Sequence, residues 1–327
     1  MRYVLGLDGG GSKLLCVIAD ETGRMIGSSL AGPTNSSYNT PEEIELSITS
    51  VISEILANHN IARQDVSIVY GALPADGQLS ISTITKNLHD GVKVNLCGEY
   101  VLSLFGAIQE DYGAVVQAGT GSFAHIRTPK TEITVGGWGP ILGDEGSGYY
   151  IGKNALMACV RMADELGIFT ILQERILTYC KQVKMRDLCT LIYATPSNKQ
   201  STLIASLCPI VGKAAAEGDK VAIDILEDAA EMLFMQASSV LKLPDVEARF
   251  PLTVAGGVWK TNPLLFNCFS TKIKQLFPQI DLRYPLFEPV IGGVLLGLRD
   301  LGFPVKAKIE ELKHHFSAYS ISADLFQ

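Results

Sequence analysis

Two glycine-rich loops carry residues whose types and spacing suit the binding of phosphate, and a third glycine turn suits a planar ring or a ribose. The first glycine loop is residues 8–13, with the sequence Asp-Gly-Gly-Gly-Ser-Lys. Because glycine lacks a Cβ atom, backbone N–H groups in such a run can approach an anion closely at left-handed backbone angles. Asp8 is suited to hold Mg²⁺, although an aspartate there can also bond its own backbone in a turn. The loop predicts a phosphate contact, with an ordinary hairpin as the alternative.

Two further segments are also rich in glycine. The second glycine loop, residues 118–122, adds the hydroxyl groups of Thr120 and Ser122, which can donate hydrogen bonds to phosphate oxygens. The third glycine turn, residues 255–259, follows an apolar run and lets the backbone approach a planar ring or a ribose. Two matched loops that face one cleft can hold a polyphosphate from both sides.

The tryptophan segment, residues 136–150, is the densest of these regions. It combines several glycines with Trp138 and the adjacent acids Asp144 and Glu145. An aromatic face can stack on the C–H face of a sugar while carboxylates accept hydrogen bonds from its hydroxyl groups. The segment therefore favours a sugar contact. A loop without a ligand, with both acids in the first turn of the following helix, is the alternative.

Two repeated patterns of strands must position these segments. Each pattern is a three-stranded meander followed by helices and parallel strands. A capping box at Thr40 and Glu43, with Pro41 as the first helical residue, predicts a helix over 41–58. The predicted strands are 3–8, 13–19, 25–31, 66–73, 92–97, 113–119, 123–127, 133–135, 251–258 and 280–284. The predicted helical regions are 41–58, 100–109, 144–243, 262–277, 289–301 and 306–315.

This duplication predicts the fold class. Two α/β units of ribonuclease-H type would flank an ATP and substrate cleft, because ligand sites are common between domains. The length of 327 residues agrees with two domains. We predict an N-terminal domain over 1–111 and a C-terminal domain over 112–303, with a helix over 304–327 packing back on the first.

Composition excludes several classes of protein. The chain is 47% hydrophobic and 19% charged, which supports full globular packing, and its formal net charge is −7. This charge gives no general reason to bind nucleic acid or anionic lipid. We find neither a signal peptide nor an apolar run of membrane-spanning length, and we expect a cytoplasmic location. The seven cysteines form no Cys-x-x-Cys pair, which favours reduced and mostly buried thiols.

Four segments together resemble one family. They are Asp-Gly-Gly-Gly-Ser at 8–12, Gly-Thr-Gly-Ser at 119–122, Gly-Gly-Trp-Gly-Pro-Ile-Leu-Gly-Asp-Glu-Gly-Ser-Gly-Tyr-Tyr-Ile-Gly at 136–152, and Ala-Gly-Gly-Val-Trp-Lys at 255–260. They resemble the BadF/BadG/BcrA/BcrD ATPase family, specifically its N-acetylglucosamine kinase branch. The resemblance implies the superfold of actin, Hsp70 and sugar kinases, and ATP-dependent, Mg²⁺-assisted phosphorylation of an amino sugar, typically at its 6-hydroxyl.

The resemblance also implies roles for individual residues. The ATP-binding positions are Gly10, Gly11, Ser12 and Lys13 of the first loop, Thr120 and Gly121 of the second, and Gly256 and Gly257 of the third turn. The substrate-binding positions are Asn35, Ser122, Trp138, Gly139 and Asp144. Asp8 is the expected metal ligand.

The predicted catalytic base departs from the family pattern. The family carries Asp-Ala-x-x-Ala-Leu-x-Gly-Ala after a strand, and this chain has Glu-Tyr-Val-Leu-Ser-Leu-Phe-Gly-Ala at 99–107. Glu99 therefore matches the family's aspartate, with a side chain one methylene longer. The alternative for Glu99 is an acid stabilised by the helix dipole. Phe123 stands where the eukaryotic enzyme has a sugar-contacting asparagine.

Several alternatives stay open at this point. An ATPase activator of 2-hydroxyacyl-CoA dehydratases shares the superfold, but it needs cluster-binding cysteines that are missing beside the second loop and the tryptophan segment. A non-catalytic sensor of sugar and ATP is a third possibility. Within kinases, N-acetylglucosamine, glucosamine and N-acetylmuramic acid are the candidate acceptors. We expect a small-molecule amino sugar as the partner, no nucleic acid or membrane, and a homodimer.

Overall fold

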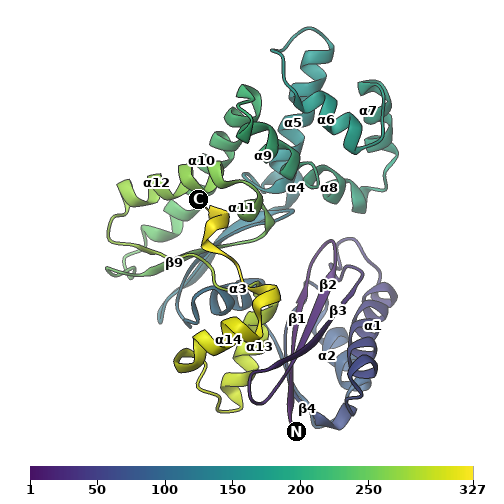
Figure 1. The fold of residues 1–327 in the computed structure, drawn as a ribbon, viewed down its shortest axis with the longest axis vertical. Helices are drawn as coiled ribbons and strands as arrows, with labels where there is room; N and C mark the ends of the chain where they lie inside the picture. The colour runs from purple at the N-terminus through teal and green to yellow at the C-terminus, as the bar shows by residue number, and fades with distance from the viewer. Residues whose placement is uncertain (327) are drawn as a thin grey trace. The chain divides into compact units, whose positions relative to one another are not determined.

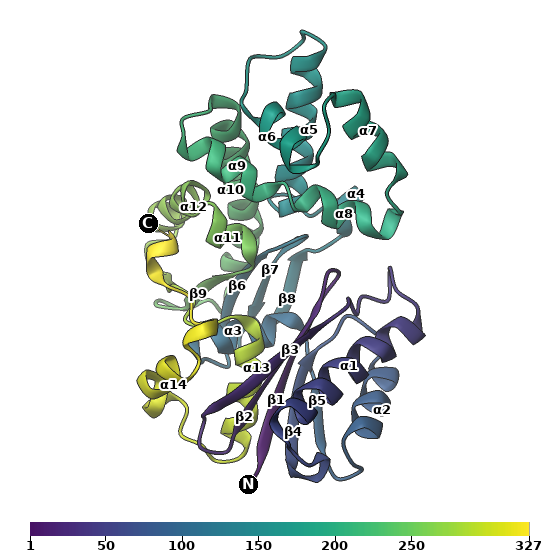
Figure 2. The ribbon, with the colours of Figure 1, turned by 45° about the vertical axis from the view of Figure 1, so that its right-hand side comes forward.

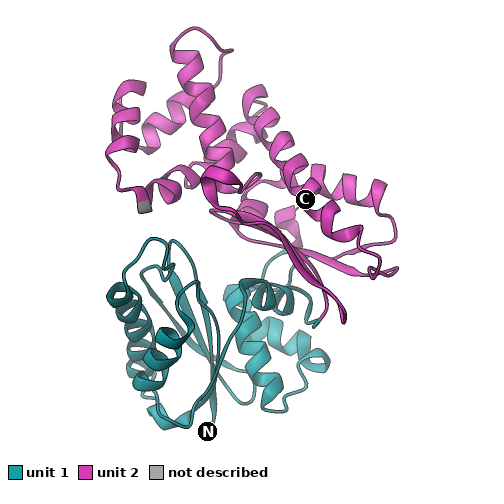
Figure 3. Cartoon of the chain, turned by 180° about the vertical axis from the view of Figure 1, so that it is seen from behind, with its two compact units in different colours: residues 1–111, 284–322 teal, residues 112–283, 323–327 magenta. Residues whose placement is uncertain are grey.

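The computed structural model divides into two compact units (Figure 3). It describes residues 1–326, with Asn198 described by its backbone only. Unit 1 comprises Met1–Asp111 and Tyr284–Ser322, and unit 2 comprises Tyr112–Arg283 together with the chain from Ala323 onward. The first crossing between the units, after Asp111, is at the predicted boundary.

Unit 1 is built on a five-stranded sheet with the order β3-β2-β1-β4-β5. The first three strands form an antiparallel meander, and β4 and β5 continue the sheet in parallel with β1. The strands are β1 (Tyr3–Gly9), β2 (Leu14–Asp20), β3 (Met25–Ala31), β4 (Val66–Ala72) and β5 (Lys93–Leu96). Each lies within about a residue or two of its predicted range.

Helices cover both faces of this sheet, as Figures 1 and 2 show. Successive side chains of a strand point to opposite faces. Leu5 and Leu7 accordingly pack with the apolar side of α1, whereas Val4 packs with α13. Gly6 is needed at this second interface, because a Cβ there would lie 2.4 Å from the carbonyl oxygen of Val290. The helices are α1 (Pro41–His59), α2 (Gly77–Asn87), α3 (Glu99–Ile108), α13 (Pro289–Asp300) and α14 (Ile309–His315).

The helix α1 forms as predicted, whereas α2 is one that the sequence analysis missed. In α1 the Thr40 hydroxyl accepts from the backbone of Glu43, whose carboxylate accepts from the backbone of Thr40. The segment that forms α2 is rich in serine and threonine, which have weak helix propensity. It is started by Asp76, which accepts a 2.8 Å hydrogen bond from the N–H of Leu79.

Unit 2 has the same sheet topology as unit 1, but different helices are attached to its sheet. Its sheet order, β10-β9-β6-β7-β8, matches that of unit 1 strand for strand, so the predicted duplication is confirmed. The long helix α10 (Lys220–Leu241) packs against β6, β7 and β8. The strands are β6 (Gly113–Ala118), β7 (Ser122–Arg127), β8 (Glu132–Gly136), β9 (Pro251–Ala255) and β10 (Asp281–Leu282).

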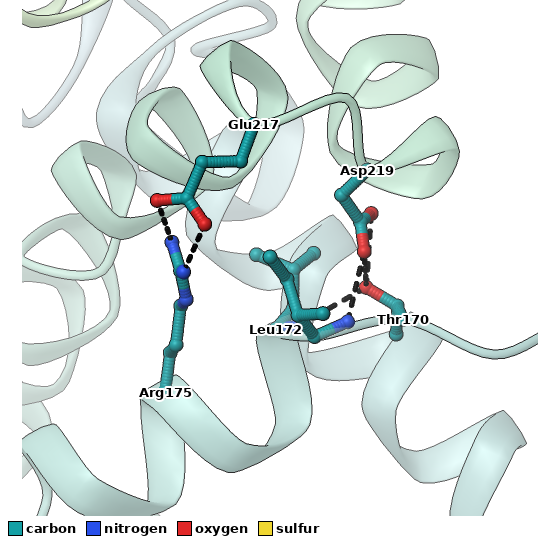
Figure 4. Close-up of polar contacts among 6 residues, drawn as sticks. Thr170, Leu172, Arg175, Glu217 and Asp219 are labelled. Carbon is teal, nitrogen blue, oxygen red and sulfur yellow. Dashed lines mark hydrogen bonds and ion pairs between the residues drawn. The ribbon is translucent and has the colours of Figure 1, made fainter.

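A group of helices between β8 and β9 enlarges unit 2. It is joined by an Arg175–Glu217 ion pair and by Asp219, which accepts from the hydroxyl of Thr170 at 2.9 Å (Figure 4). No helix within residues 1–326 is both long and apolar enough to cross a membrane. The helices of this group are α4 (Gly139–Leu142), α5 (Gly148–Ala163), α6 (Leu172–Tyr179), α7 (Met185–Ala194), α8 (Ser197–Ala205) and α9 (Cys208–Ala216). Two further helices of unit 2, α11 (Gly257–Thr261) and α12 (Pro263–Leu276), follow β9.

The C-terminal part of the chain differs from the prediction. The chain returns to unit 1 at Tyr284 rather than at residue 304, because α13 is part of the core of unit 1. A Cβ on Gly292 of α13 would lie 2.0 Å from the carbonyl oxygen of Leu102 in α3. The predicted single helix over 304–327 is wrong, since α14 is flanked by short 3-10 turns: η2 (Lys306–Lys308), η3 (Ser317–Tyr319) and η4 (Ala323–Phe326), besides η1 (Arg63–Asp65) earlier. Residue 327 lies outside the described residues.

Candidate functional site

In unit 1, two carboxylates lie at the carboxyl edge of the sheet. Asp8 is the last residue but one of the central strand β1, and Glu99 begins α3 shortly after the end of β5 at Leu96. Since β1, β4 and β5 are parallel, their carboxyl ends meet at one edge, where ligands bind in open α/β sheets. The two side chains are close enough for the charge of Asp8 to affect the titration of Glu99.

The surroundings of Glu99 favour its neutral form. Desolvation by the surrounding protein, and then the negative charge of Asp8, raise the pKa of Glu99 to about 7. Solvent nevertheless reaches the residue, which is exposed. Glu99 is therefore accessible from solvent, while the protein around its carboxyl group raises its pKa. Glu99 is also in the first turn of α3, whose dipole acts in the opposite sense, so desolvation and Asp8 outweigh the helix end.

The first glycine loop is open along its backbone. The hairpin is closed by a 3.0 Å hydrogen bond from the N–H of Gly10 to the carbonyl of Lys13, and Ser12 and Lys13 are exposed. A Cβ on Gly10 or Gly11 would meet no heavy atom within 4 Å. The expected left-handed backbone angles are wrong, since none of the loop's three glycines has a positive φ. Glycine here leaves space beside the backbone rather than permitting an unusual conformation.

Thr34 supports this loop and was missed by the sequence analysis. Its N–H donates to the carbonyl of Gly10 at 3.0 Å, which places the segment that contains Asn35 beside the first glycine loop. Its fully buried hydroxyl lies against Gly9, where a Cβ would be 2.3 Å away. Asn35 is half-buried, and its side-chain oxygen accepts from the N–H of Ser37. The only sequence signal for Thr34 was its position next to Asn35.

In unit 2, the second glycine loop is packed against the tryptophan segment. The carbonyl of Gly119 accepts a 2.8 Å hydrogen bond from Gly148, and that of Thr120 accepts a 3.2 Å bond from Tyr149. Thr120 and Gly121 stay half-buried, so part of the loop is accessible. The loop and the tryptophan segment therefore form one hydrogen-bonded structure.

Asp144 is the central side chain of that structure. It is buried with a left-handed φ of 60°, and it accepts hydrogen bonds from the backbone of Ser122, at 3.4 Å, and of Gly139. Burial raises the pKa of Asp144, and these two N–H donors oppose that rise. The alternative of first-turn acids is wrong for Asp144 and Glu145, because α5 begins at Gly148 after the cap Ser147.

The Ser122 hydroxyl is directed into the protein. It is buried and donates to the carbonyl of Glu145 at 2.7 Å. Gln236 of α10, a residue that the sequence analysis missed, donates to the same carbonyl at 3.1 Å. The helical periodicity of α10 is the only sequence signal that could have indicated Gln236. In this structure Ser122 thus contributes its hydroxyl to the support of the second glycine loop.

Trp138 lies on an exposed apolar turn. It immediately precedes the short helix α4 and is 75% exposed, while Ile141 and Leu142 of that helix are 90% and 80% exposed. Gly139 has a φ of +83°, and a Cβ on it would meet nothing within 4 Å. The indole face is therefore open to a ligand, as the stacking prediction requires.

The third glycine turn lies directly against the second glycine loop. Gly256 has φ 104° and ψ 164°, a region essentially restricted to glycine, and its Cβ would be 2.3 Å from the carbonyl oxygen of Ala118. A Cβ on Gly257 would meet nothing within 4 Å. Gly256 is thus required for packing, and Gly257 leaves an open face.

The chemistry of these residues fits ATP and Mg²⁺. Within residues 1–326 no group of three or more His, Cys, Asp or Glu side chains is arranged to hold a metal. Mg²⁺ in phosphate-transfer sites commonly uses one or two carboxylates and takes its other ligands from water and phosphate. Asp8 beside an open backbone loop meets that requirement.

Comparison with known proteins shows the family. The family model of the BadF/BadG/BcrA/BcrD ATPase family matches residues 5–297. The chain is 30% identical to an N-acetylmuramic acid/N-acetylglucosamine kinase of Clostridium acetobutylicum, over 90% of this chain and 98% of that protein. It is 28% identical to an N-acetyl-D-glucosamine kinase of Dictyostelium discoideum, over 90% and 97% respectively.

The fold is shared with a solved structure. A crystal structure from Porphyromonas gingivalis, proposed to be an N-acetylglucosamine kinase, has a TM-score of 0.73 and 18% identity, covering 92% of this chain and 99% of that one. The predicted sugar-kinase fold class is confirmed. The matched family model, spanning nearly the whole chain, and the relatives of similar length lead to one statement: this chain belongs to the BadF/BadG/BcrA/BcrD ATPase family.

Proposed function

We propose that this protein is an ATP-dependent amino-sugar kinase that phosphorylates a sugar hydroxyl, most simply the 6-hydroxyl of N-acetylglucosamine. The observation that carries the proposal is that two curated relatives, each matching 90% of this chain, are both named as N-acetylglucosamine kinases. Glucosamine and N-acetylmuramic acid are the other acceptors of this class, and N-acetylmuramic acid is in the name of one relative.

Glu99 is the proposed general base. The sugar oxygen attacks the γ-phosphorus of ATP, the bond between that phosphorus and the β–γ bridging oxygen breaks, and ADP leaves. The hydroxyl proton passes to the Glu99 carboxylate. A pKa raised to about 7 supports this role, because a base is most effective when its pKa is near the working pH. Asp8, beside it, is the proposed ligand of Mg²⁺, which would neutralise charge on the phosphates.

Open backbone supports the ATP contacts. Gly10, Gly11 and Gly257 each leave the space of a side chain empty, so phosphate or adenosine atoms can approach the chain there. The remaining proposed ATP contacts are Ser12, Lys13, Thr120, Gly121 and Gly256.

Exposed and half-buried groups support the sugar contacts. Trp138 offers an open aromatic face, and Asn35 offers a half-buried amide. Asp144 and Gly139 are hydrogen-bonded to each other, so we assign them to the wall that supports the sugar. Ser122 completes the proposed substrate-binding set, acting through its backbone because its hydroxyl is bonded to Glu145.

A panel of acceptors tests the function. ADP release is measured with Mg·ATP and, in turn, N-acetylglucosamine, glucosamine, N-acetylmuramic acid, N-acetylmannosamine, glucose and no sugar. Strong stimulation by one amino sugar is expected and would identify the substrate. Release equal to the blank with every sugar would contradict the kinase and leave an ATPase or a sensor.

We also propose that the protein is a cytoplasmic homodimer. All seven cysteines are free, as suits a reducing compartment. Leu166, Ile168 and Phe169 expose large apolar side chains within four residues, which a second copy would cover. Light scattering after size-exclusion chromatography is expected to give twice the 35.3 kDa chain mass, and Phe169→Asp is expected to give the single chain mass. A wild-type protein of single-chain mass would contradict the dimer.

A further inference from the structure

The third glycine turn leads into α11, a short helix whose position depends on the elements packed around it. Helix α11 has only five residues, and its first residue is Gly257. No side chain caps its N-terminus. Helices this short are unstable by themselves and depend on tertiary packing. The location of Gly256 and Gly257 must therefore be set by what α11 packs against.

Trp259 attaches α11 to the sheet of unit 2. Its side chain is fully buried, and its Nε1–H donates a 3.0 Å hydrogen bond to the carbonyl of Val116 in β6. Strand β6 leads directly into the second glycine loop. The indole ring meets Phe269 at a centroid distance of 5.0 Å and Phe266 at 6.2 Å, both edge to face. One tryptophan thus fixes the turn relative to the second loop and to α12.

The C-terminal turn of the chain completes this cluster. After Ser322 the chain leaves unit 1, and η4 packs against both α11 and α12 in unit 2, as the yellow end of the ribbon shows in Figures 1 and 2. Phe326 is 1% exposed, and its ring lies 4.8 Å from that of Phe266. Leu325, its neighbour, is 40% exposed. The buried Phe326 side chain thus anchors the segment on α12.

We infer that Phe326 is a positioning residue for the adenosine end of the nucleotide. It holds Phe266 and Trp259, and through them the open turn at Gly256 and Gly257, in the position that ATP requires. The inference rests on the proposed function, which assigns the third glycine turn to ATP. It predicts a selective effect: loss of Phe326 weakens nucleotide binding and leaves sugar binding unchanged. The reason is that η4 packs against α11 and α12, whereas the proposed sugar contacts belong to other segments of the chain.

Phe326→Ala tests the inference against two matched controls. Packed networks of this kind change binding by about two- to thirtyfold when one member is lost. We expect a rise in that range in the KM for ATP and in the Kd for Mg·ADP measured by calorimetry, with the KM for the sugar unchanged. Phe326→Leu is expected to restore most of the affinity. Leu325→Ala tests the exposed neighbour and Phe316→Ala removes a buried aromatic side chain of unit 1, and both are expected to leave nucleotide affinity unchanged.

The possible outcomes separate the inference from the proposed function. If Phe326→Ala lowers the melting temperature but changes neither nucleotide constant, the residue is only structural and the inference is overturned. An equal rise in the KM values for ATP and sugar also overturns it. If the wild type phosphorylates no sugar but binds Mg·ADP, and Phe326→Ala weakens that binding, the inference stands and the kinase proposal falls. If the wild type binds no nucleotide, both the positioning role of Phe326 and the kinase proposal are contradicted. If Phe326→Ala does not fold, Phe326→Val takes its place, and a rise in both nucleotide constants with an unchanged KM for the sugar is again the expected result.

Discussion

The two glycine loops occupy the same place in two sheets of identical topology, yet they are built differently. The first loop, in unit 1, is an open hairpin whose glycines leave empty space and whose nearby acid, Glu99, is exposed. The second loop, in unit 2, is bonded to the tryptophan segment, and its nearby acid, Asp144, is buried and bonded to backbone N–H groups. A shared fold thus fixes where a loop lies but not what its acid does.

This difference assigns separate tasks to the two acids. Glu99 has the access and the raised pKa that proton transfer needs. Asp144 holds the second loop in shape and supports whatever binds there. Substitutions at Glu99 and at Gly10 or Gly11 of the first loop should therefore reduce activity with little loss of stability, and substitutions around the second loop should reduce stability.

Glu99→Gln is expected to give the largest effect. Removal of a well-placed general base lowers kcat by about 10²- to 10⁴-fold, and Mg·ADP affinity should stay unchanged. The matched control is Glu42→Gln, which alters an exposed first-turn acid of α1 and should leave kcat unchanged. A variant at position 99 with wild-type turnover would remove Glu99 from the mechanism.

Gly256→Ala is expected to be the most destabilising change. A residue with a side chain is strained at φ 104°, and its Cβ would collide with the carbonyl of Ala118, so the loss of unfolding free energy should be about 3 kcal/mol. Gly257→Ala, next in the chain, meets no atom within 4 Å and should change stability little. Urea denaturation of the pair measures the contrast. Equal stabilities would mean that the third turn does not pack on the second loop as described.

Asp144→Ala tests the packing role of the second acid. It leaves the N–H groups of Ser122 and Gly139 without their acceptor, which should lower the free energy of unfolding by about 2 kcal/mol. Glu145→Ala is the control, since the backbone carbonyl of Glu145, and not its side chain, supports Ser122. If the two variants were equally stable, Asp144 would not be a structural acid.

The raised pKa of Glu99 predicts how both activity and stability depend on pH. Glu99 must be deprotonated to act as a base, so kcat/KM should fall about tenfold per pH unit below its raised pKa of about 7. The free energy of unfolding should change with pH in the opposite direction to the activity. The folded pKa lies above the ordinary value of 4.5, so charging Glu99 lowers stability as the pH rises between these values. Glu99→Gln should thus melt higher than the wild type at pH 8 and not at pH 4. A flat activity profile between pH 5 and 8 would contradict the assignment.

Gly10→Ala is expected to have the smallest effect on stability. Its Cβ meets nothing within 4 Å, so the free energy of unfolding should change by less than about 0.5 kcal/mol, while the KM for ATP rises because the open face is filled. Gly121→Ala is the corresponding change in the second glycine loop, where the added Cβ would lie 2.7 Å from the carboxylate of Asp144. Thermal unfolding should rank Gly121→Ala below Gly10→Ala, and the reverse order would contradict the difference between the loops.

Much of the architecture could be predicted because it depends on local patterns. The capping box at Thr40 predicted the start of α1, and apolar runs bounded by turns predicted the strands of both sheets. Apart from α2, whose serine- and threonine-rich segment has weak helix propensity, most of what failed was non-local. The place of α13 in unit 1 depends on close contacts of Gly6 and Gly292, and the burial of Asp144 depends on N–H groups far away in sequence. Thr34 and Gln236 carried no motif at all. The position of Glu99 followed from the family pattern, whereas its raised pKa follows only from the three-dimensional surroundings.

The most direct test of the kinase activity and of the role of Glu99 follows the γ-phosphate of ATP. ATP labelled at the γ-phosphorus is incubated with Mg²⁺, N-acetylglucosamine and either the wild type or Glu99→Gln, and the labelled products are separated. We expect the wild type to transfer the label to the sugar, at its 6-hydroxyl, and Glu99→Gln to leave it in ATP. Label recovered from the wild type as inorganic phosphate in place of sugar phosphate would contradict the kinase, and equal transfer by both proteins would contradict the role of Glu99.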